Sequence, residues 1–359
     1  MSQRPTSHKR TIEVLEPGFF TTVQDLGRPG LQRFGMPVSG AMDREALIYG
    51  NLLLGNAPGS AGLECTLLGP SLRFSSPAWF AVTGARCAPL LDGKPVPCWH
   101  ACVAHKGSDL IIGPATAGAR INVQVDGGID VPFVMGSRAT YTTARLGGYD
   151  GRPLGKGDVV PLLGESRDPP GALAEDRVVP PPFGWRPPEY DDQFAVRVIL
   201  GPQDDHFTDE AIAVFLGSAY TVGNESDRMG YRLAGPALKH RVGADIVSDG
   251  IPLGAIQVPG HGLPIILMVD RQVTGGYAKI ACVISADMPR LAQARPGSRV
   301  AFQAVSVKEA HAEARSRARE IEDFAKAVAG QRAQRMESAR RFSVRVREHD
   351  YMVLVEPLE

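Results

Sequence analysis

The stretch LPIILMVDRQVTGGYAKIACV, residues 263–283, decides the fold class. An apolar run ends at Asp270, a polar segment with two adjacent glycines follows, and a second apolar run then begins. Short apolar runs bounded by glycine and charged residues are typical of strands joined by turns. Polar side chains at strand ends are also where β scaffolds present their sites. We therefore predict a mainly β protein with functional residues near this turn.

The same pattern of short apolar runs bounded by turn residues continues through most of the 359 residues. The 40 glycines and 29 prolines are spread along the chain, and the short apolar runs between them indicate many turns and strands. Hairpins are predicted over 90–97, where Asp92-Gly93 supplies the turn, and over 105–113. One early helix is predicted over 41–55, because five of its apolar residues fall near one face: Met42, Ala46, Ile48, Leu52 and Leu53.

The chain length favours two or three domains, and changes in composition mark their borders. Residues 1–10 are expected to form a disordered arm, followed by a first β domain over 11–164. Residues 165–192 are rich in proline, which disfavours both a helix and a central strand and so predicts an interdomain linker. Strand alternation resumes in a second β domain over 193–305, which includes a helix with Thr208 as its N-cap.

Residues 306–359 form an extension whose sequence pattern differs from that of the two β domains. A long helix is predicted to end at Gly330. Its apolar stripe is narrow, so we expect a solvated helix lying on a domain; the stripe consists of Ala314, Ala318, Ile321, Ala325 and Val328. Apolar residues then alternate around a polar turn between 342 and 355, which predicts a terminal hairpin.

The second β domain echoes the first. DLGR (25–28) precedes GMPVSGAMD (35–43), and DRMGYR (227–232) precedes GIPLGAIQ (250–257). An ancient duplication would explain the common order and predicts two similar β domains. Chance reuse of turn residues is the alternative, since the spacing differs between the halves.

Charge and cysteine content bear on the class of protein. Lys+Arg and Asp+Glu both count 39, and this balance argues against the basic face that nucleic-acid binding needs. The five cysteines, an odd and sparse set, indicate a reduced protein. The N-terminal MSQRPTSHKRT lacks the apolar core of a signal peptide, and no apolar run reaches the ~18 residues of a membrane span. We expect a cytoplasmic protein with neither nucleic acid nor membrane as a partner.

Two stretches come close to known motifs without matching them. GRPLGKGD (151–158) lacks the glycine spacing of a P-loop and the Ser or Thr after its lysine. CWHACVAH (98–105) contains four zinc-type ligands. Alternate residues on one strand face lie ~6.6 Å apart, however, and metal ligands converge more tightly than that. We predict a strand with buried cysteines there, and no metal site.

Polar residues gather instead in four glycine-rich stretches: 21–43, 225–235, 248–259 and 263–283. Turn and capping chemistry explains any single member about as well as function does. As a set they favour a functional site. The candidates are Gln24, Asp25, Arg28, Ser39, Asp43, Asp227, Arg228, Arg232, Ser248, Asp249, Gln257, Asp270, Arg271, Gln272, Gly275, Gly276 and Tyr277.

Six stretches together resemble one known family: VQDLGRPGLQRFGMPVSGAMD, LECTLLGPSLRF, GGIDVPFVMGSRATYTTARLGGYDGRPLGKGD, ESDRMGYRL, SDGIPLGAIQVP and LMVDRQVTGGY. They resemble the family of 5-oxoprolinase C subunits, also described as allophanate-hydrolase-subunit-2-like and as the A–B carboxyltransferase domain of urea carboxylase. The resemblance extends from about Thr11 to Val305. It implies two cyclophilin-like β-barrel-type domains. His261, Val273 and Ala278 depart from the residues that are commoner in the family.

The resemblance also implies partners and cofactors. Bacterial members act with a B-type subunit (allophanate-hydrolase-subunit-1-like) and an A-type subunit to open 5-oxoproline to glutamate with ATP. We expect ATP and Mg to be shared with these partners, and the isolated chain to be inactive. Two alternatives stay open. One is a carboxyltransferase subunit that receives a carboxyl group from biotin on a partner protein, and the other is a regulatory module that antagonises a kinase inhibitor.

Opening a lactam assigns roles to the candidates. Phosphorylation of the carbonyl oxygen creates a leaving group, so the site needs cations for phosphate and carboxylate and an acid for the ring N–H. Guanidinium groups suit the first task and carboxyls the second. We predict Asp227, Arg228 and Asp270 as catalytic, with Arg228 pointing into a cleft and Asp227 orienting it. Predicted for substrate binding are Gln24, Asp25, Arg28, Asp43, Arg232, Gln257, Gln272, Gly275, Gly276 and Tyr277; for Arg232, which lies nearer the following strand, a structural role competes.

Overall fold

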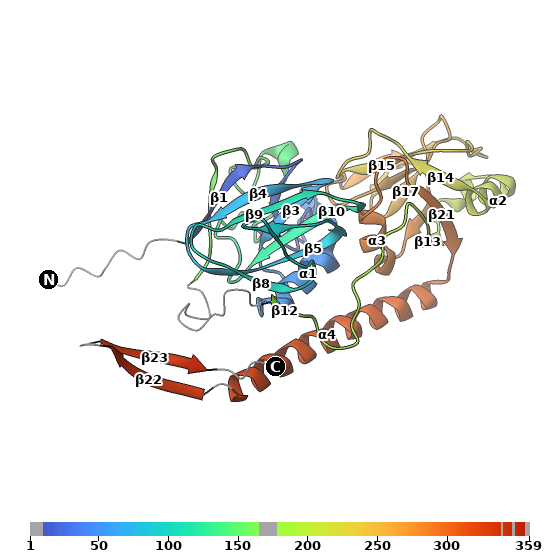
Figure 1. Cartoon of the computed structure of the whole chain (residues 1–359). Coiled ribbons are helices and arrows are strands. Elements are labelled where there is room, and N and C mark those ends of the chain that lie inside the picture. Colours follow the sequence, from blue (N-terminus) through green and yellow to red (C-terminus); the bar gives the residue numbers. More distant parts are fainter. Residues whose placement is uncertain (1–9, 165–177, 339, 347–348, 356–359) are drawn as a thin grey trace.

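The computed structural model describes residues 10–164, 178–338, 340–346 and 349–355. It is mainly β, as predicted, with two β domains and one long helix that passes from the second domain along the first (Figure 1). The first domain contains two six-stranded sheets, and the second is built on a closed barrel of seven strands. The predicted terminal hairpin is also present, formed by β22 (Arg340–Val346) and β23 (His349–Val355).

The two sheets of the first domain enclose its apolar core. Alternate residues of both sheets, such as Val14, Phe74, Val82 and Val123, are buried between them. One sheet has the order β11 (Val159–Pro161), β1 (Thr11–Glu16), β4 (Leu68–Phe74), β9 (Asp109–Pro114), β6 (Leu90–Leu91) and β7 (Lys94–Pro95). The other has the order β12 (Val178–Val179), β8 (Ala101–Ala104), β5 (Ala78–Arg86), β10 (Ala117–Val125), β3 (Gly62–Thr66) and β2 (Thr22–Gln24).

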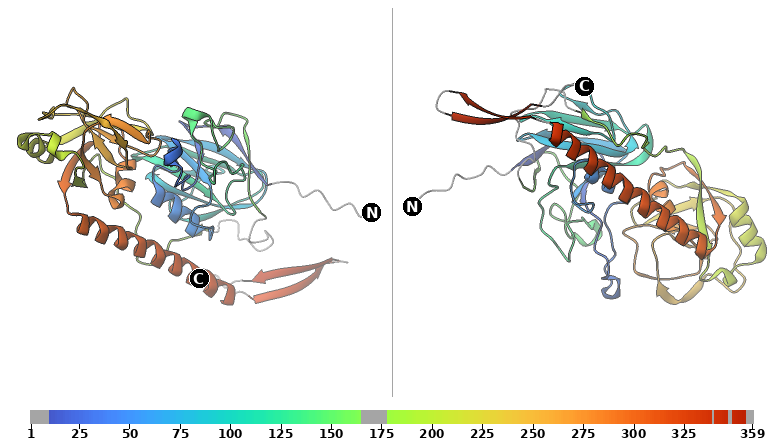
Figure 2. Two further views of the ribbon diagram at one scale, coloured as in Figure 1. Left: turned by 180° about the vertical axis from the view of Figure 1, so that it is seen from behind. Right: turned by 90° about the horizontal axis from the view of Figure 1, so that it is seen from below.

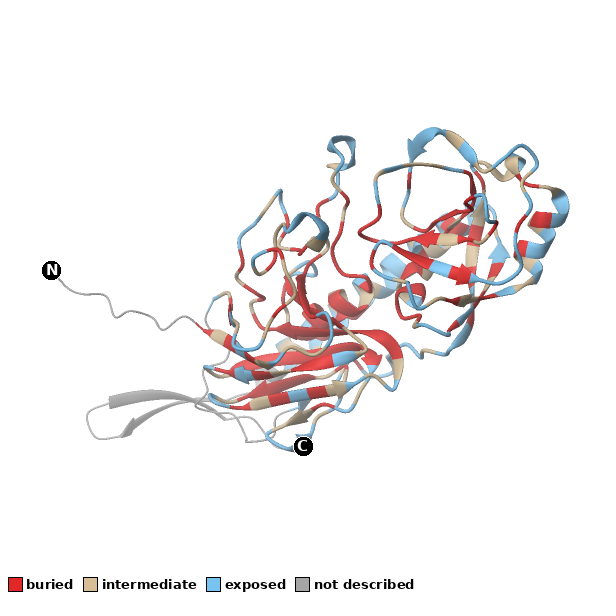
Figure 3. Ribbon diagram, turned by 90° about the horizontal axis from the view of Figure 1, so that it is seen from above, coloured by how far each residue is buried: buried red, intermediate tan, exposed pale blue. Residues whose placement is uncertain are grey.

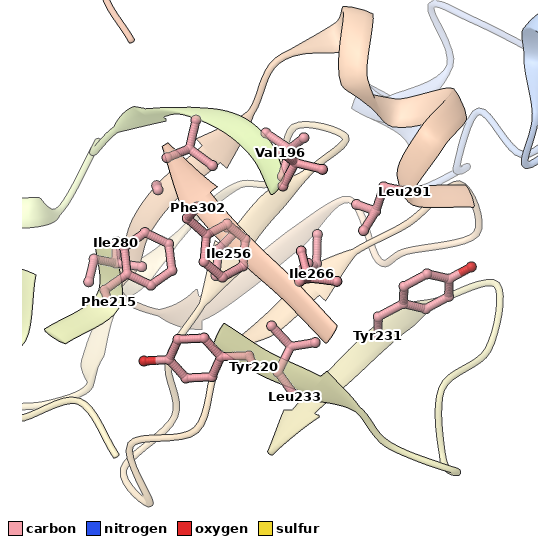
Figure 4. Close-up of a cluster of buried hydrophobic side chains, with 14 of the residues drawn as sticks. Val196, Phe215, Tyr220, Tyr231, Leu233, Ile256, Ile266, Ile280, Leu291 and Phe302 are labelled. Carbon is pink, nitrogen blue, oxygen red and sulfur yellow. The ribbon is translucent and has the colours of Figure 1, made fainter. Parts of the chain in front are cut away.

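The barrel of the second domain closes around its own apolar core. Phe215 stacks on Phe302 inside it, and Tyr220, Ile256 and Ile266 converge on the same interior (Figure 4). Its order is β13 (Gln193–Leu200), β20 (Lys279–Val283), β17 (Ala255–Gln257), β18 (Ile265–Leu267), β15 (Gly230–Ala234), β14 (Ala219–Val222) and β21 (Arg299–Ala304). The barrel closes through a parallel pairing of β13 with β21, and a separate two-stranded sheet consists of β16 (Asp245–Gly250) and β19 (Thr274–Tyr277).

Helices begin at the residue types expected from the sequence. The carboxylate of Asp43 accepts from Ala46 N at the start of α1 (Arg44–Leu53), and Thr208 Oγ1 accepts from Ala211 N at the start of α2 (Asp209–Gly217). The other helices within the described residues are α3 (Met288–Ala292), α4 (Val307–Ser338) and the short 3-10 segments η1 (Gln32–Phe34), η2 (Thr142–Ala144), η4 (Asp204–His206) and η5 (Ser285–Asp287). None of the helices in the described ranges is long and apolar enough to cross a membrane.

Helix α4 ties the two domains together. It follows β21 of the barrel, crosses to the first domain and lies on the outer face of the sheet that contains β5 (Figure 2). Phe324 and Val328 are buried there with Tyr49 of α1 and Trp99. Trp185 of the proline-rich segment packs into the same aromatic cluster. Figure 3 shows buried residues concentrated on the sheet strands of the first domain and on the barrel strands of the second.

Several local predictions need correction. Residues 105–113 do not form a hairpin, because the turn at 105–108 joins β8 in one sheet to β9 in the other. Helix α4 continues past Gly330 to Ser338, since a glycine inside a helix with many helix-forming neighbours only weakens it. The described part of the predicted linker, 178–192, includes β12, which pairs with β8 at the edge of its sheet; this agrees with the expectation that its prolines disfavour a central strand. Residues 1–9 and 165–177 lie outside the described residues.

The first domain holds two six-stranded sheets, and the second holds a closed barrel of seven strands. The duplication hypothesis stays a prediction. The echoes in sequence lie in two segments that meet at the boundary between the domains, where Arg228 donates to the Gly40 carbonyl.

Candidate functional site

The candidates converge where the two domains meet. The segment 38–43 of the first domain lies against the residues that follow β18, and Ser39 N donates to Val269 O at 3.1 Å. Ser39 Oγ donates to the Asp270 carboxylate. Asp270 N in turn donates to Arg228 O at 2.9 Å. The stretch 263–283 thus presents its aspartate to the other domain.

Arg228 is the centre of a buried ion network at this boundary. Its Nε donates to Asp270 Oδ2 at 2.8 Å and its Nη1 to Glu64 Oε1 at 2.7 Å. Its Nη2 donates to the Gly40 carbonyl at 2.6 Å. Burial acts to lower the pKa of Arg228, but the charges of Asp270 and Glu64 outweigh it and the pKa is raised. The guanidinium is therefore held as a cation by two carboxylates.

Glu64 completes the network from the first domain. It lies on β3, and its Oε2 accepts from Met42 N at 2.8 Å and from Asp43 N at 3.4 Å. Sequence reasoning missed this residue. The available signal was a lone acid inside the apolar run GLECT, where a charge on a buried strand needs a partner. The partner itself lies 164 residues away along the chain.

Arg28 provides the second buried cation and differs from Arg228 in its hydrogen bonding. Its side chain is only 1% exposed, and its Nη2 donates to the Ala139 carbonyl. Its Nε and Nη1 have no hydrogen-bond partner among the described residues. Burial lowers the pKa of Arg28, while the nearby charges of Asp25 and Asp270 act in the opposite direction. Two guanidinium nitrogens, Nε and Nη1, are thus available to donate to an anion at this boundary.

The backbone at Gly147 lies close against the Arg28 side chain. Gly147 has φ of +66°, and a Cβ there would lie 2.9 Å from Arg28 Nη2 and 2.3 Å from the Ala139 carbonyl oxygen, so only glycine fits. Asp25 ties the neighbouring loops together: its Oδ1 accepts from Gly27 N and Ser137 Oγ, both at 2.7 Å. Asp25 is therefore a loop-fixing residue whose charge also acts on Arg28.

Asp43 and Gln24 both have hydrogen-bond partners within the chain, and their contact with substrate stays a prediction. Asp43 caps α1, and its Oδ2 accepts from Gln293 Nε2 at 2.6 Å across the domain boundary. Burial raises the pKa of Asp43 to about 6. Gln24 Nε2 donates to Thr22 Oγ1 at 3.0 Å and to the Thr140 carbonyl at 3.2 Å. Gln24 Oε1 has no hydrogen-bond partner within the described residues.

A second group of candidates lies in the barrel domain. Gln257 Nε2 donates to the Tyr277 carbonyl, and a Cβ on Gly275 would lie 2.8 Å from that amide nitrogen. Beside them Lys279, fully buried, reaches Asp249 Oδ2 at 3.2 Å. Lys279 was not among the sequence candidates, since a single lysine in YAKIACV gives no motif. Gln272 and Ser248 are exposed, and Arg271 donates to the Ile251 and Met268 carbonyls.

Asp227 and Arg232 do not join the site. Asp227 Oδ1 accepts from Met229 N at 2.8 Å and Gly230 N at 3.1 Å, so it shapes the turn that leads into β15 and does not orient Arg228. Arg232 points to the surface and lies 3.7 Å from Glu225, both well exposed. Arg228 is only 6% exposed, and its guanidinium is engaged by Asp270, Glu64 and the Gly40 carbonyl; its contact with substrate stays a prediction.

Comparison with known proteins places these residues in a family. The sequence model of one protein family, described as the carboxyltransferase domain, subdomain A and B, matches residues 34–304. The chain belongs to this family. The C subunit of 5-oxoprolinase from Escherichia coli strain K12 is 38% identical over 299 residues, covering 83% of this chain and 93% of that protein. The protein of the same name from Haemophilus influenzae shows equal identity and coverage.

The same family includes parts of larger enzymes. Urea amidolyase of Saccharomyces cerevisiae is 32% identical over 91% of this chain, but the match spans only 18% of that protein. The crystal structure of the Kluyveromyces lactis urea amidolyase superposes with a TM-score of 0.80 at 31% identity, over 89% of this chain and 20% of that one. This member is thus homologous both to the 5-oxoprolinase C subunits and to the carboxyltransferase region of urea carboxylase. Its relatives work within enzyme complexes or multidomain enzymes.

Proposed function

We propose that this chain is the C-type subunit of an ATP-dependent 5-oxoprolinase and that Arg28 binds the carboxylate of 5-oxoproline. The observation that supports this most directly is the pair of unpartnered nitrogens, Nε and Nη1, on a buried guanidinium, at a boundary between the described parts of the two domains. These two nitrogens lie on opposite edges of the guanidinium, so each can donate singly to an anionic oxygen, while Nη2 donates to the Ala139 carbonyl. The match to 5-oxoprolinase C subunits over nearly their whole length supports the reaction class.

The other residues of the boundary position Arg28 and seal its surroundings. Asp270 has both oxygens engaged, by Ser39 and Arg228, so its part in the proposal is to fix these groups and not to protonate the ring nitrogen. Asp25 and Gly147 hold the backbone against Arg28.

Cofactor and partners belong to the same proposal. ATP would supply the phosphoryl group that activates the lactam carbonyl, and Mg would accompany it. Arg28 fits a phosphate as well as a carboxylate, since both present anionic oxygens that accept from guanidinium N–H groups. We propose that B-type and A-type partner proteins complete the ATP site and the proton transfer, and that the assembled complex is cytoplasmic.

Biotin-dependent carboxyl transfer is the second candidate. The superposition on a urea amidolyase at a TM-score of 0.80 favours it specifically. In that case Arg28 would hold the carboxyl group delivered by biotin on a partner protein. The choice of substrate separates the two candidates, since only the second needs a biotinylated carrier.

The test is a reconstituted complex with two assay arms. The chain is copurified with its A-type and B-type partner proteins, and glutamate release is measured with 5-oxoproline, with and without ATP. The second arm measures bicarbonate fixation with a biotinylated carrier protein and urea. ATP- and 5-oxoproline-dependent glutamate formation supports the first function. Carrier-dependent fixation without glutamate formation refutes it in favour of the second.

A further inference from the structure

Two cysteines outside the domain boundary lie within contact distance of each other. Cys87 directly follows β5, and Cys98 precedes Trp99 and β8. Their Sγ atoms are 3.6 Å apart, and Cys98 Sγ also lies 3.5 Å from the Cys87 carbonyl. Both side chains are half-buried, and both thiols are free. The segment between them leaves the second sheet, forms the β6–β7 hairpin in the first sheet and returns.

This separation is short enough for a bond to form without rebuilding the fold. A disulfide has an S–S length of about 2.05 Å, so the two sulfurs need to approach by roughly 1.5 Å, which side-chain rotation can supply. The other cysteines are engaged elsewhere: Cys65 Sγ is directed at the Ile121 carbonyl, Cys102 Sγ at the His100 carbonyl and Cys282 Sγ at the Leu253 carbonyl. Cys87 and Cys98 are therefore the pair whose geometry favours a disulfide.

The two thiols are also unequal in acidity. The hydrogen bond from Cys87 lowers the pKa of Cys98, and the same contact raises the pKa of Cys87. Burial raises the pKa of Cys102 to about 12 and raises that of Cys65 further. Since the thiolate is the reactive form, Cys98 is the expected nucleophile of the pair and Cys87 the resolving thiol.

We propose that Cys87 and Cys98 form a redox-active dithiol that hydrogen peroxide converts to a disulfide. The Cys98 thiolate attacks one peroxide oxygen, the O–O bond breaks, and the departing hydroxide takes up a proton to give water. This leaves a sulfenic acid on Cys98. The Cys87 sulfur then attacks the Cys98 sulfur, the S–O bond breaks, and the hydroxyl leaves as a second water with the Cys87 proton. Two thiols lose two electrons and one peroxide is reduced to two waters.

The cysteine pair lies next to the aromatic cluster that packs α4 onto the first domain. Trp99, the residue after Cys98, packs against Tyr49 and Trp185, with ring centroids 6.3 and 5.5 Å apart. Phe324 of α4 packs against Tyr49 and Trp185 as well. A disulfide at Cys98 fixes the backbone on one side of this cluster. The oxidised chain is therefore expected to melt at a higher temperature than the reduced chain.

The test uses the full chain, reduced, freed of reductant and then exposed to a small excess of hydrogen peroxide. Remaining thiols are alkylated and peptides are mapped by mass spectrometry. We expect a linked peptide pair containing Cys87 and Cys98, and a fall from five titratable thiols to three (5 − 2). The Cys282→Ser variant should keep the link, because this cysteine lies in the barrel domain. A link that joins Cys98 to Cys102, or no link while Cys98 is overoxidised, would overturn the proposal.

A second variant identifies the attacking sulfur and does not depend on the stability of the disulfide. In Cys87→Ser, peroxide should leave a sulfenic acid on Cys98 that dimedone traps, and the melting difference between oxidised and reduced protein should vanish. Trapping on Cys87 in the Cys98→Ser variant, with none on Cys98 in Cys87→Ser, would refute the assignment of Cys98 as the nucleophile.

Discussion

Arg228 of the barrel domain donates to Glu64 of the first domain, with 2.7 Å between Nη1 and Oε1 and both side chains almost fully buried. The same guanidinium holds Asp270 of its own domain and the Gly40 carbonyl of the other. The relative position of the two domains therefore depends on charge pairing as well as on apolar contact. A buried pair of this kind specifies an arrangement, because removing one partner leaves an uncompensated charge.

Replacing Arg228 by alanine should destabilise the chain strongly. Glu64 and Asp270 would remain buried without their common partner, a loss typically worth about 3–5 kcal/mol. We expect a large fall in melting temperature on thermal or urea denaturation. Arg232→Ala is the matched control: this side chain is exposed, and its loss should change the free energy of unfolding by no more than ~0.5 kcal/mol. Equal effects of the two variants would contradict the network.

Arg228→Lys should lower both the melting temperature and the activity of the assembled complex. From the motif alone, this change should cut kcat/KM at least about tenfold while hardly affecting stability, because the motif places the side chain in a cleft. The buried position changes the second part. Lysine keeps the charge but cannot reach both carboxylates and a carbonyl at once. Thermal melts of the chain test the predicted loss of stability, and kinetics of the complex test the predicted loss of activity. An unchanged melting temperature would support the original prediction that Arg228 lies in a cleft.

The sequence predicted the class of fold and the neighbourhood of the site, but not the pairing of residues within it. Turn residues and apolar runs located most strands, and Thr208 and Asp43 mark helix starts through local chemistry. The partnership of Arg228 with Glu64 spans 164 residues and leaves no local trace. The error at 105–113 has the same origin, since a turn signal does not tell which sheet the next strand joins.

Arg28→Lys should impair the complex far more than it affects stability. In the free chain, the guanidinium nitrogens Nε and Nη1 make no hydrogen bond among the described residues, so few contacts are lost when lysine replaces arginine. If these groups bind the substrate carboxylate, kcat/KM of the complex should fall at least about tenfold, roughly 1.4 kcal/mol. Arg33→Lys, an exposed neighbour, serves as control. Normal kinetics for Arg28→Lys would remove this residue from the site.

Glu45 should make the stability of the chain depend on pH. Burial raises its pKa from 4.5 to about 7, although Arg317 nearby acts to lower it. Between these values the folded chain binds a proton that the unfolded chain releases, so stability falls as the pH rises. The contribution is complete below about 4.5 and lost above about 7.

Glu45→Gln isolates this effect. Glutamine has no proton to release, so the melting temperature of the wild type relative to Glu45→Gln should decline as the pH rises through this interval. Glu322→Gln, which changes an exposed carboxylate on α4, should show no such trend. A difference that stays constant or grows with pH would contradict the assignment to Glu45.

Helix α4 should be required for stability through Phe324, and the residues beyond its end should not. Phe324 is 3% exposed, and its ring centroid lies 4.8 Å from that of Tyr49 and 4.9 Å from that of Trp185. Removing a buried phenylalanine typically costs about 3–5 kcal/mol, so Phe324→Ala should lower the free energy of unfolding by that order. The exposed Lys326 on the same helix gives the control Lys326→Ala. From sequence we expected deletion of 331–359 to leave the activity of the complex within a few-fold of wild type, with a loss of solubility or of subunit affinity allowed for. Since α4 extends to Ser338, the sharper experiment deletes 339–359. Activity of the complex within a few-fold of wild type is expected, and loss of activity with assembly intact would show that the extension takes part in the chemistry.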